Sequence, residues 1–194
     1  SPVEYSVHGR RYSVFGSLTP TEEAEQVLAC TYWVDITQLA NTRELYYSTR
    51  PLVCIILIDN YEDLVRSVPD SARSNLRADI EELLDQWVDK SNGLLCRYDR
   101  DRYLFLMEEQ HLEALKRDKF AVLDGVHKVV SPNGIAASLS IGIGRDGSLE
   151  EMFRYAALAI DMALSRGGDQ VVIKNQFNFE FFGGRSKEQE RRTK

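Results

Sequence analysis

The sequence has few cysteines and no long apolar run. Its three cysteines are Cys30, Cys54 and Cys96, and no two of them form a CxxC pair. This spacing does not support a zinc site or a dithiol redox centre, and it fits a reducing cytoplasm. No run reaches the ~18 apolar residues that a membrane-crossing helix needs, and no signal peptide is present. We therefore expect any membrane anchor to lie outside this piece of a longer chain.

Positive charges are fewer than negative ones. The 24 Lys and Arg residues face 30 Asp and Glu residues, which leaves a net charge of −6. A dedicated nucleic-acid binder carries a basic stripe, so we expect no nucleic-acid partner. A nucleotide ligand stays open, because one local site can be basic on an acidic protein. The 194 residues, 43% of them hydrophobic, suit one sizeable domain with a small appendage.

Histidine is rare and scattered. The three histidines are His8, His111 and His127, and none of them stands beside a candidate nucleophile. We expect surface or helix-flank positions for all three, rather than metal ligation or catalysis.

The first 36 residues predict a small antiparallel sheet. Apolar residues alternate over residues 4–18 around a turn at residues 8–10, and a third strand follows over residues 27–36. Three such strands bury too little apolar surface to fold alone. An amphipathic helix is predicted over residues 38–49, with Asp35 or Thr37 as its cap. One side of that helix carries Leu39, Thr42, Leu45, Tyr46 and Thr49.

A larger α+β unit follows Pro51. Seven apolar residues, 52–58, predict a buried central strand that ends at Asp59. A helical turn over 61–68 and a long amphipathic helix from Asp70 come next. The segment from Leu95 to Glu108 then predicts a β-hairpin with its charged tip at residues 99–101. After it we expect one helix over 110–130, with Val130 among its inward residues, and a strand over 137–143. A further helix opens with a capping box at Ser148, and Leu149, Phe153 and Leu164 are among the residues it is expected to bury. The last strand is expected over 170–174.

This order, β-α-β-β-α-β-α-β, predicts a ferredoxin-like α/β sandwich of the nucleotidyl-cyclase palm type. In such a sheet the first strand lies beside the hairpin, so Asp59 and Asp101 approach each other. These two acids are the candidate metal ligands, and Asp99, Arg100 and Arg102 complete a candidate nucleotide site. The alternative is a solvent-exposed hairpin tip with no ligand, in which the arginines only neutralise the charge of the neighbouring carboxylates.

The domain boundaries follow from these elements. We expect a β unit over residues 1–36, a linker helix over 37–50, the palm domain over 51–176 and a linker over 177–194. The start of that last segment is too aromatic for a free tail, so it should pack on this domain or on a missing neighbour. Its aromatic residues are Phe177, Phe179, Phe181 and Phe182.

Residues 52–174 resemble GGDEF domains. The family's Asp-x-Asp-x-Phe-Lys at the end of the first strand is here Leu57-Ile58-Asp59-Asn60-Tyr61-Glu62. Its Gly-Gly-Asp-Glu-Phe hairpin is Asp99-Arg100-Asp101-Arg102-Tyr103, and its Ser-Ile-Gly is intact as Ser140-Ile141-Gly142. The resemblance implies a degenerate site, because Leu57 replaces a metal-binding acid and Arg102 replaces the motif's Glu. The inhibitory Arg-x-x-Asp becomes Lys90-Ser91-Asn92-Gly93. Diguanylate cyclase activity and this feedback site are therefore expected to be absent.

Two further motifs narrow the resemblance. Asp35-Ile36-Thr37 is similar to the exit of a PAS sensory domain, with a plain β-extension as the alternative. Arg166-Gly167-Gly168-Asp169-Gln170-Val171 and the Phe-Phe-Gly-Gly that follows resemble the middle of membrane-anchored PAS–GGDEF–DHH cyclic-di-AMP phosphodiesterases. That family implies transmembrane helices and a PAS domain before this region and a DHH phosphodiesterase domain after it. No Asp-His-His triplet occurs here, so the family's catalytic site is absent.

The resemblance implies a regulatory module at the cytoplasmic face of a bacterial membrane, which transmits signals to the phosphodiesterase domain. Weak binding or hydrolysis of ATP with Mg²⁺ is allowed, and haem is expected only with a complete PAS domain. A homodimer formed through the helix over 38–49 is a further expectation. The alternatives are a stand-alone, low-activity Mg²⁺-dependent ATPase and a purely structural dimerisation module.

Overall fold

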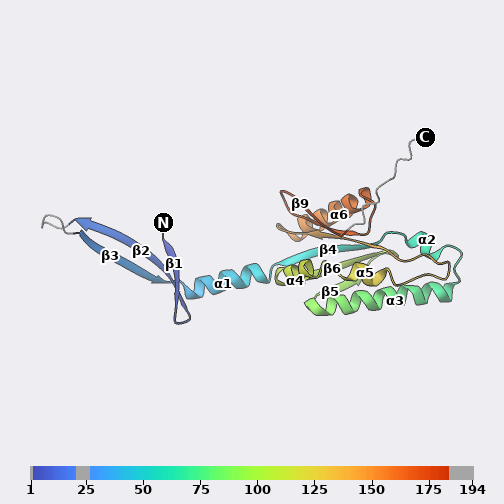
Figure 1. Cartoon of the computed structure of the whole chain (residues 1–194), viewed down its shortest axis with the longest axis horizontal. Helices are drawn as coiled ribbons and strands as arrows, with labels where there is room; N and C mark the ends of the chain where they lie inside the picture. The colour runs from blue at the N-terminus through green and yellow to red at the C-terminus, as the bar shows by residue number, and fades with distance from the viewer. Residues whose placement is uncertain (1, 21–26, 184–194) are drawn as a thin grey trace. The chain divides into compact units, whose positions relative to one another are not determined.

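The computed structural model describes residues 2–20 and 27–183 and divides into two units, Ser1–Thr49 and Arg50–Lys194 (Figure 1). Each unit is described by itself. Within the described ranges, no helix is long and apolar enough to cross a membrane.

The first unit is a three-stranded antiparallel sheet followed by one helix. The sheet order is β1-β2-β3, as the alternation of apolar residues predicted. Trp33 lies between Tyr5 and Tyr12, with ring centroids 5.8 Å away in both cases. Tyr5 and Trp33 are exposed by 54% and 50%, and Ala40 is the one buried hydrophobic residue in the described part of this unit. The elements are β1 (Val3–Val7), β2 (Arg10–Pro20), β3 (Val27–Asp35) and α1 (Thr37–Ser48).

The second unit is a six-stranded sheet with helices on both faces. Its strand order is β5-β6-β4-β7-β8-β9, and all neighbours are antiparallel except β7 and β8. The predicted palm topology is therefore confirmed, with the apolar run of β4 in the interior of the sheet. The strands are β4 (Pro51–Ile58), β5 (Leu94–Arg97), β6 (Arg102–Glu108), β7 (Leu139–Gly144), β8 (Gln170–Lys174) and β9 (Phe179–Gly183). The helices are α2 (Tyr61–Val65), α3 (Asp70–Val88), α4 (Leu112–Arg117), α5 (Val122–Val126) and α6 (Leu149–Ser165), with short 3₁₀ turns at Asp89–Ser91 and Glu109–His111.

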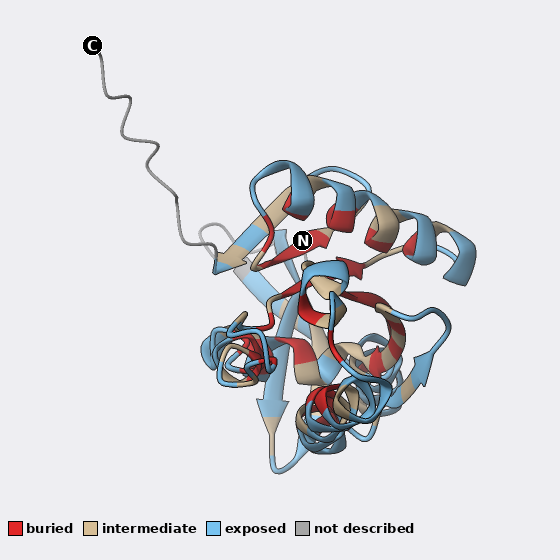
Figure 2. Ribbon diagram, turned by 90° about the vertical axis from the view of Figure 1, so that its right-hand side faces the viewer, coloured by how far each residue is buried: buried red, intermediate tan, exposed pale blue. Residues whose placement is uncertain are grey.

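The two faces of β4 belong to different cores, because successive strand residues point to opposite sides. Cys54, Ile56 and Ile58 join the larger core with residues of α3, α4 and α5. Val53, Ile55 and Leu57 pack against Met152, Ala156 and Ile160 of α6. Figure 2 shows buried residues in the strands and on the sheet-facing sides of the helices that cover them.

Helix α6 lies unusually close to β7. A Cβ added at Gly144 would lie 1.7 Å from the Met152 carbonyl oxygen, and one at Gly142 would lie 2.2 Å from the Ala156 oxygen. Side chains of any size are therefore excluded at these strand positions. The predicted capping box is confirmed: the Ser148 hydroxyl accepts from the Glu151 amide at 3.2 Å, and the Glu151 carboxylate accepts from the Ser148 amide at 2.9 Å.

Three expectations need correction. The single helix over 110–130 is wrong, because Lys119 and Phe120 adopt left-handed φ values of 50° and 52° and separate α4 from α5. This turn places Phe120 in the core with no exposed surface. Val130, expected to point inward, is 54% exposed. The expected apolar face of α6 was also too wide, since only a narrow stripe of that helix meets the sheet. The residues expected to be buried that lie outside this stripe are Leu149, Phe153 and Leu164.

The expected start of a linker at residue 177 is the third correction. β9 pairs with β8 in antiparallel register, from Gln170 opposite Gly183 to Lys174 opposite Phe179. Phe182 packs on Phe120, with ring centroids 5.4 Å apart. The aromatic alternation is therefore the last strand of the sheet. The remainder of the predicted linker lies outside the described residues.

Candidate functional site

The hairpin tip lies at the end of β4, where the GGDEF resemblance places a metal site. Leu57 stands directly opposite Arg102 in the β4–β6 register, and the Ile58 amide donates to the Asp101 carbonyl oxygen at 2.9 Å. Leu57 is only 4% exposed and packs under α6. The Arg102 side chain is 41% exposed, with its Nε 3.9 Å from Asp101 Oδ1. An aliphatic side chain and a cation thus stand at adjacent positions where oxygen donors would be needed.

The other tip residues make local contacts. Asp99 Oδ1 accepts from the Arg100 amide at 2.7 Å, which shapes the turn. Arg100 Nη2 lies 4.0 Å from Glu62 Oε1, and both side chains are at least 75% exposed. An ion pair this exposed contributes little to stability.

Asp59 engages a different part of the chain. Its Oδ2 accepts from the Asp169 amide at 2.9 Å, in the turn before β8. Gly168 is needed beside it, because its φ is +73° and an added Cβ would lie 2.8 Å from the same oxygen. Asp59 Oδ1 is buried, and no described residue donates a well-aligned hydrogen bond to it. Burial raises the pKa of Asp59 and the nearby Asp169 carboxylate adds to the rise, while the Asp169 amide opposes it.

Asp59 belongs to a cluster that the sequence did not predict. Asp169 Oδ1 lies 2.7 Å from Nε2 of His127, which directly follows α5. We call Asp59, Asp169 and His127 the Asp59 cluster. His127 was expected at a surface or helix-flank position, and it does flank α5, but its contact with Asp169 was not predicted. One signal in the sequence could have pointed to this cluster. The turn Gly167-Gly168-Asp169 before a predicted strand indicates left-handed backbone, and such turns often hold a side chain from elsewhere in the chain.

The structure therefore brings the backbones of Asp59 and Asp101 together, as the topology predicted, but gives the two carboxylates separate partners. Among the described residues, no group of three or more His, Cys, Asp or Glu side chains could hold a metal ion. This arrangement fits a protein-held metal pair poorly, and a magnesium site at these two acids stays a prediction.

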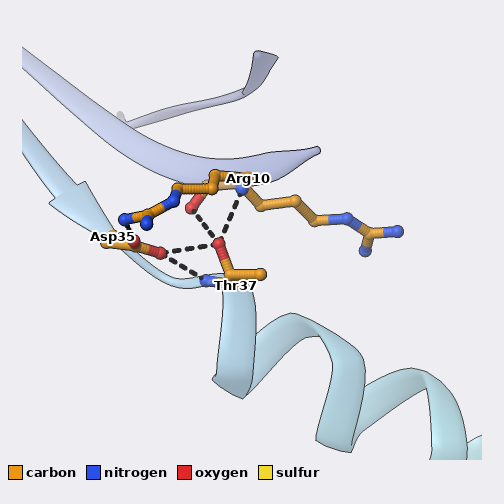
Figure 3. Close-up of polar contacts among 4 residues, drawn as sticks. Arg10, Asp35 and Thr37 are labelled. Atoms are coloured by element: carbon orange, nitrogen blue, oxygen red, sulfur yellow. Dashed lines mark hydrogen bonds and ion pairs between the residues drawn. The ribbon is translucent and has the colours of Figure 1, made fainter. Parts of the chain in front are cut away.

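A second polar site joins the sheet of the first unit to α1 (Figure 3). Asp35 Oδ1 accepts from the Thr37 hydroxyl at 2.6 Å and from the Thr37 amide at 2.9 Å. Arg10 Nη1 lies 3.3 Å from Asp35 Oδ2, and the Arg11 amide donates to the Thr37 hydroxyl at 2.9 Å. The Thr37 hydroxyl, then the Thr37 amide, and finally Arg10 hold the pKa of Asp35 below its ordinary value. The start of α1 is therefore bonded to both β2 and β3.

A family model for the GGDEF domain of GdpP-like cyclic-di-AMP phosphodiesterases matches residues 56–181. The chain belongs to this GdpP-like GGDEF family. Cyclic-di-AMP phosphodiesterase GdpP of Bacillus subtilis strain 168 is 34% identical over 165 residues, which cover 84% of this chain and 25% of that protein. Cyclic-di-AMP phosphodiesterase PdeA of Listeria monocytogenes is 31% identical over 178 residues, covering 91% of this chain and 27% of that protein. The chain thus spans about a quarter of the length of these curated relatives.

Other similarities agree with the GdpP-like GGDEF assignment. A phytoplasma "membrane protein-large ribosomal subunit bL9 fusion protein" from the Aster yellows witches'-broom strain is 27% identical over 161 residues, covering 81% of this chain and 19% of that protein. Among solved structures, the active GGEEF domain of a Vibrio cholerae diguanylate cyclase has a TM-score of 0.56 at 18% identity, covering 70% of this chain and 88% of that one. The Caulobacter crescentus DgcB GGDEF domain has a TM-score of 0.57 at 12% identity, covering 70% and 85%. These two structures establish the fold.

Proposed function

We propose that this chain is a regulatory GGDEF domain of a cyclic-di-AMP phosphodiesterase, one that has lost diguanylate cyclase chemistry and passes signals to a DHH-type catalytic domain elsewhere in the protein. The observation that carries the proposal is the register of β4 and β6, which sets Leu57 opposite Arg102 in a member of the GdpP-like family. Similarity to a protein named a membrane protein supports a location at a membrane, and its cytoplasmic face is part of our proposal.

The loss of cyclase chemistry follows from charge. Two divalent ions need several carboxylate oxygens, and a buried leucine supplies none. A guanidinium about 4 Å from such an ion is repelled by several kcal/mol, even at an effective dielectric constant of about 20. The hairpin also carries Asp99 and Arg100 in place of the two glycines that let a substrate approach the backbone.

The test is incubation of the purified chain with GTP and Mg²⁺ or Mn²⁺, followed by chromatography for cyclic-di-GMP. We expect no product. Synthesis of cyclic-di-GMP above a protein-free control would overturn the proposal.

Signal transmission is supported by the junction in Figure 3. Because Asp35 and Thr37 bond the start of α1 to the neighbouring strands, a change in the β2–β3 pair would displace the start of the helix. In the whole phosphodiesterase, Asp35→Ala should therefore change the response to the upstream signal while the rate of hydrolysis without that signal stays the same. An unchanged response would count against this role of the junction.

Self-association through α1 is part of the same proposal. Leu39, Leu45 and Tyr46 are more than 60% exposed, and Leu39 and Tyr46 stand seven residues apart, one coiled-coil repeat. Sedimentation should show a homodimer that Leu39→Glu with Tyr46→Glu converts to monomer. A monomer at high concentration in the unmodified chain would contradict it.

Nucleotide binding is a subsidiary proposal, in which ATP with Mg²⁺ would rest on the acids at the ends of β4 and the hairpin. Calorimetric titration with ATP, GTP and cyclic-di-AMP, with and without Mg²⁺, tests it. Heat that is lost in Asp101→Asn and retained in the exposed control Asp161→Asn supports this site. No heat for any nucleotide supports a purely mechanical module. Steady phosphate release abolished by Asp101→Asn would favour the ATPase.

A further inference from the structure

Strand β9 forms one edge of the six-stranded sheet, and nothing above assigns that edge a role. Among the described residues β8 is the only strand that pairs with it, so alternate backbone N–H and C=O groups of Phe179–Gly183 point away from the sheet. Native edge strands are commonly protected by lysine, proline or a bulge. β9 has none of these, and its one charged residue, Glu180, is paired with Lys116 Nζ at 2.9 Å. This edge is therefore open to another extended segment.

The register places two rings of β9 on the α6 face of the sheet. Phe179 stands opposite Lys174 and Phe181 stands opposite Val172, and residues directly opposite each other in a sheet share a face. Val172 packs against α6, with Phe179 beside it. The two ring centroids are 6.3 Å apart, and Phe181 is 40% exposed. A partly exposed pair of rings thus borders the open edge.

Each of these rings carries a cation. Lys174 Nζ lies 4.9 Å from the centroid of Phe179, and the Arg166 guanidinium carbon lies 4.4 Å from the centroid of Phe181. The hydrogen bonds of these two cations go to uncharged oxygens. Among the described residues, no Asp or Glu forms an ion pair with either of them. On a chain of net charge −6, this surface presents positive charge without a carboxylate partner.

The charge on this face selects the partner. Pairing of β9 with the β9 of a second copy would place Lys174 and Arg166 of both copies on one face, where like charges repel. An acidic strand would neutralise them instead. Alternate side chains of a strand stand about 6.6 Å apart on one face, close to the 6.3 Å between the two ring centroids. Acidic side chains at positions i and i+2 of an added strand would therefore meet one cation each.

The residue between those two acids would point to the opposite face of the sheet. On that side a hollow of about 490 Å³ adjoins the end of β9, and its lining includes Lys119, Leu123, Phe182 and Gly183. The hollow has space for a side chain of the added strand, and Leu123 and Phe182 favour an aliphatic one. The two faces beside the edge therefore fit a segment in which acidic and aliphatic residues alternate.

We propose that the β9 edge binds an extended acidic peptide segment of a partner protein, which adds to the sheet as a seventh strand and sets acidic side chains at alternate positions against Lys174 and Arg166. The inference goes beyond the regulatory role and does not depend on it.

The test titrates the blocked peptide acetyl-Thr-Glu-Val-Glu-Val-Thr-amide into the full chain and follows the amide NMR spectrum. We expect saturable shifts concentrated at the amides of β9. The same peptide with glutamine in place of both glutamates should bind severalfold more weakly. No saturable shift at β9, or equal affinity for the glutamine peptide, would overturn the proposal.

Backbone methylation of the peptide tests strand addition itself. One version is N-methylated on both valines and the other on both glutamates, so each blocks the hydrogen-bond donors of one strand edge. One of the two should lose binding and the other should keep it, because a single edge of the added strand faces β9. Equal binding of both versions would refute strand addition.

Matched variants of the chain locate the charges. Lys174→Met with Arg166→Met should weaken binding of the glutamate peptide severalfold and leave the glutamine peptide unchanged. Lys90→Met with Arg66→Met, which removes exposed cations elsewhere in the same unit, should change neither. Equal weakening by the two double variants would refute the site. Shifts at β9 that grow with protein concentration in the absence of peptide would show that a second copy occupies the edge, which also overturns the proposal.

Discussion

Two residues, Asp59 and Gly168, determine how the end of β4 is held. The carboxylate of Asp59 is partly buried, and its Oδ2 accepts a hydrogen bond from the Asp169 amide at 2.9 Å. Gly168 allows this contact, since any side chain there would enter the space of the carboxylate. Burial outweighs the hydrogen bonds to this carboxylate and raises the pKa of Asp59, so ionisation costs stability and the pH dependence of unfolding should show that cost.

The first prediction concerns Asp59→Asn. Because burial raises the pKa of Asp59 in the folded chain, the folded state favours the protonated acid. The free energy of unfolding should therefore fall as the pH rises from the unfolded-state pKa, about 3.9, through the higher folded-state pKa. The asparagine side chain of the variant keeps an oxygen for the Asp169 amide and does not ionise. Urea unfolding across pH should show a smaller fall in the variant and equal or greater stability at neutral pH.

The control for this experiment is Asp161→Asn on the exposed side of α6. Its pH profile should parallel that of the unmodified chain. If Asp59→Asn also gives a parallel profile, ionisation of Asp59 does not limit stability.

The second prediction compares Gly168→Ala with Gly167→Ala. Both glycines have positive φ, +73° and +104°, so alanine at either position costs about 1–2 kcal/mol in backbone strain. Only Gly168 faces Asp59, and displacing the carboxylate should add about 1–3 kcal/mol. Urea denaturation measures both variants, and equal losses would show that the contact with Asp59 is not restrictive.

At the scale of elements, the sequence predicted correctly those helices, strands and turns that are determined by residues close together in the chain. The apolar run of β4, the hairpin and the Ser148 capping box are of this kind. The break between α4 and α5 was not predictable, because Lys119 and Phe120 are neither glycine nor asparagine, and burial of the Phe120 ring stabilises the turn.

Part of the candidate site was predictable for the same reason. Leu57 opposite Arg102 follows from the topology of a strand beside a hairpin. The partner of Asp59 does not, because Asp169 lies 110 residues later in the chain and nothing in either local sequence specifies the pairing.

The third prediction belongs to the junction of α1 with its sheet. The Thr37 hydroxyl is the largest cause of the lowered pKa of Asp35. Thr37→Val should therefore raise the pKa of Asp35 toward its ordinary value of 3.8, as measured by NMR titration of the carboxyl carbon. A lowered pKa stabilises the fold above the ordinary value, and this stabilisation is lost as the pH falls through the folded-state pKa. Thr42→Val on the same helix is the control and should leave Asp35 unchanged.

At the scale of the whole molecule, the two units differ in how much they bury. All three hydrophobic core clusters consist of residues from the second unit. The first unit leaves large side chains such as Leu18 and Tyr32 exposed by 73% and 63%. We therefore expect the second unit to supply most of the stability of the chain, and the first to need a partner surface to become a stable domain.

The fourth prediction follows from this difference. A chain of residues 50–194 should fold alone and unfold in urea with the midpoint of residues 1–194. Residues 1–49 alone should show no cooperative transition and little protection of amides from hydrogen exchange. A lower midpoint for residues 50–194 would show that the first unit stabilises the second.

The contact of α6 with β7 limits which motions this domain can use. At Gly142 and Gly144 no side chain separates the backbone of α6 from β7, so a shift of the helix there would bring backbone atoms into collision. We therefore expect β4, β7 and α6 to move together as one rigid body when the domain is deformed. We expect deformation mainly in the opposite layer, where α4 and α5 are short and are separated by the turn at Lys119 and Phe120. The domain should therefore deform more easily on its α4–α5 side than on its α6 side.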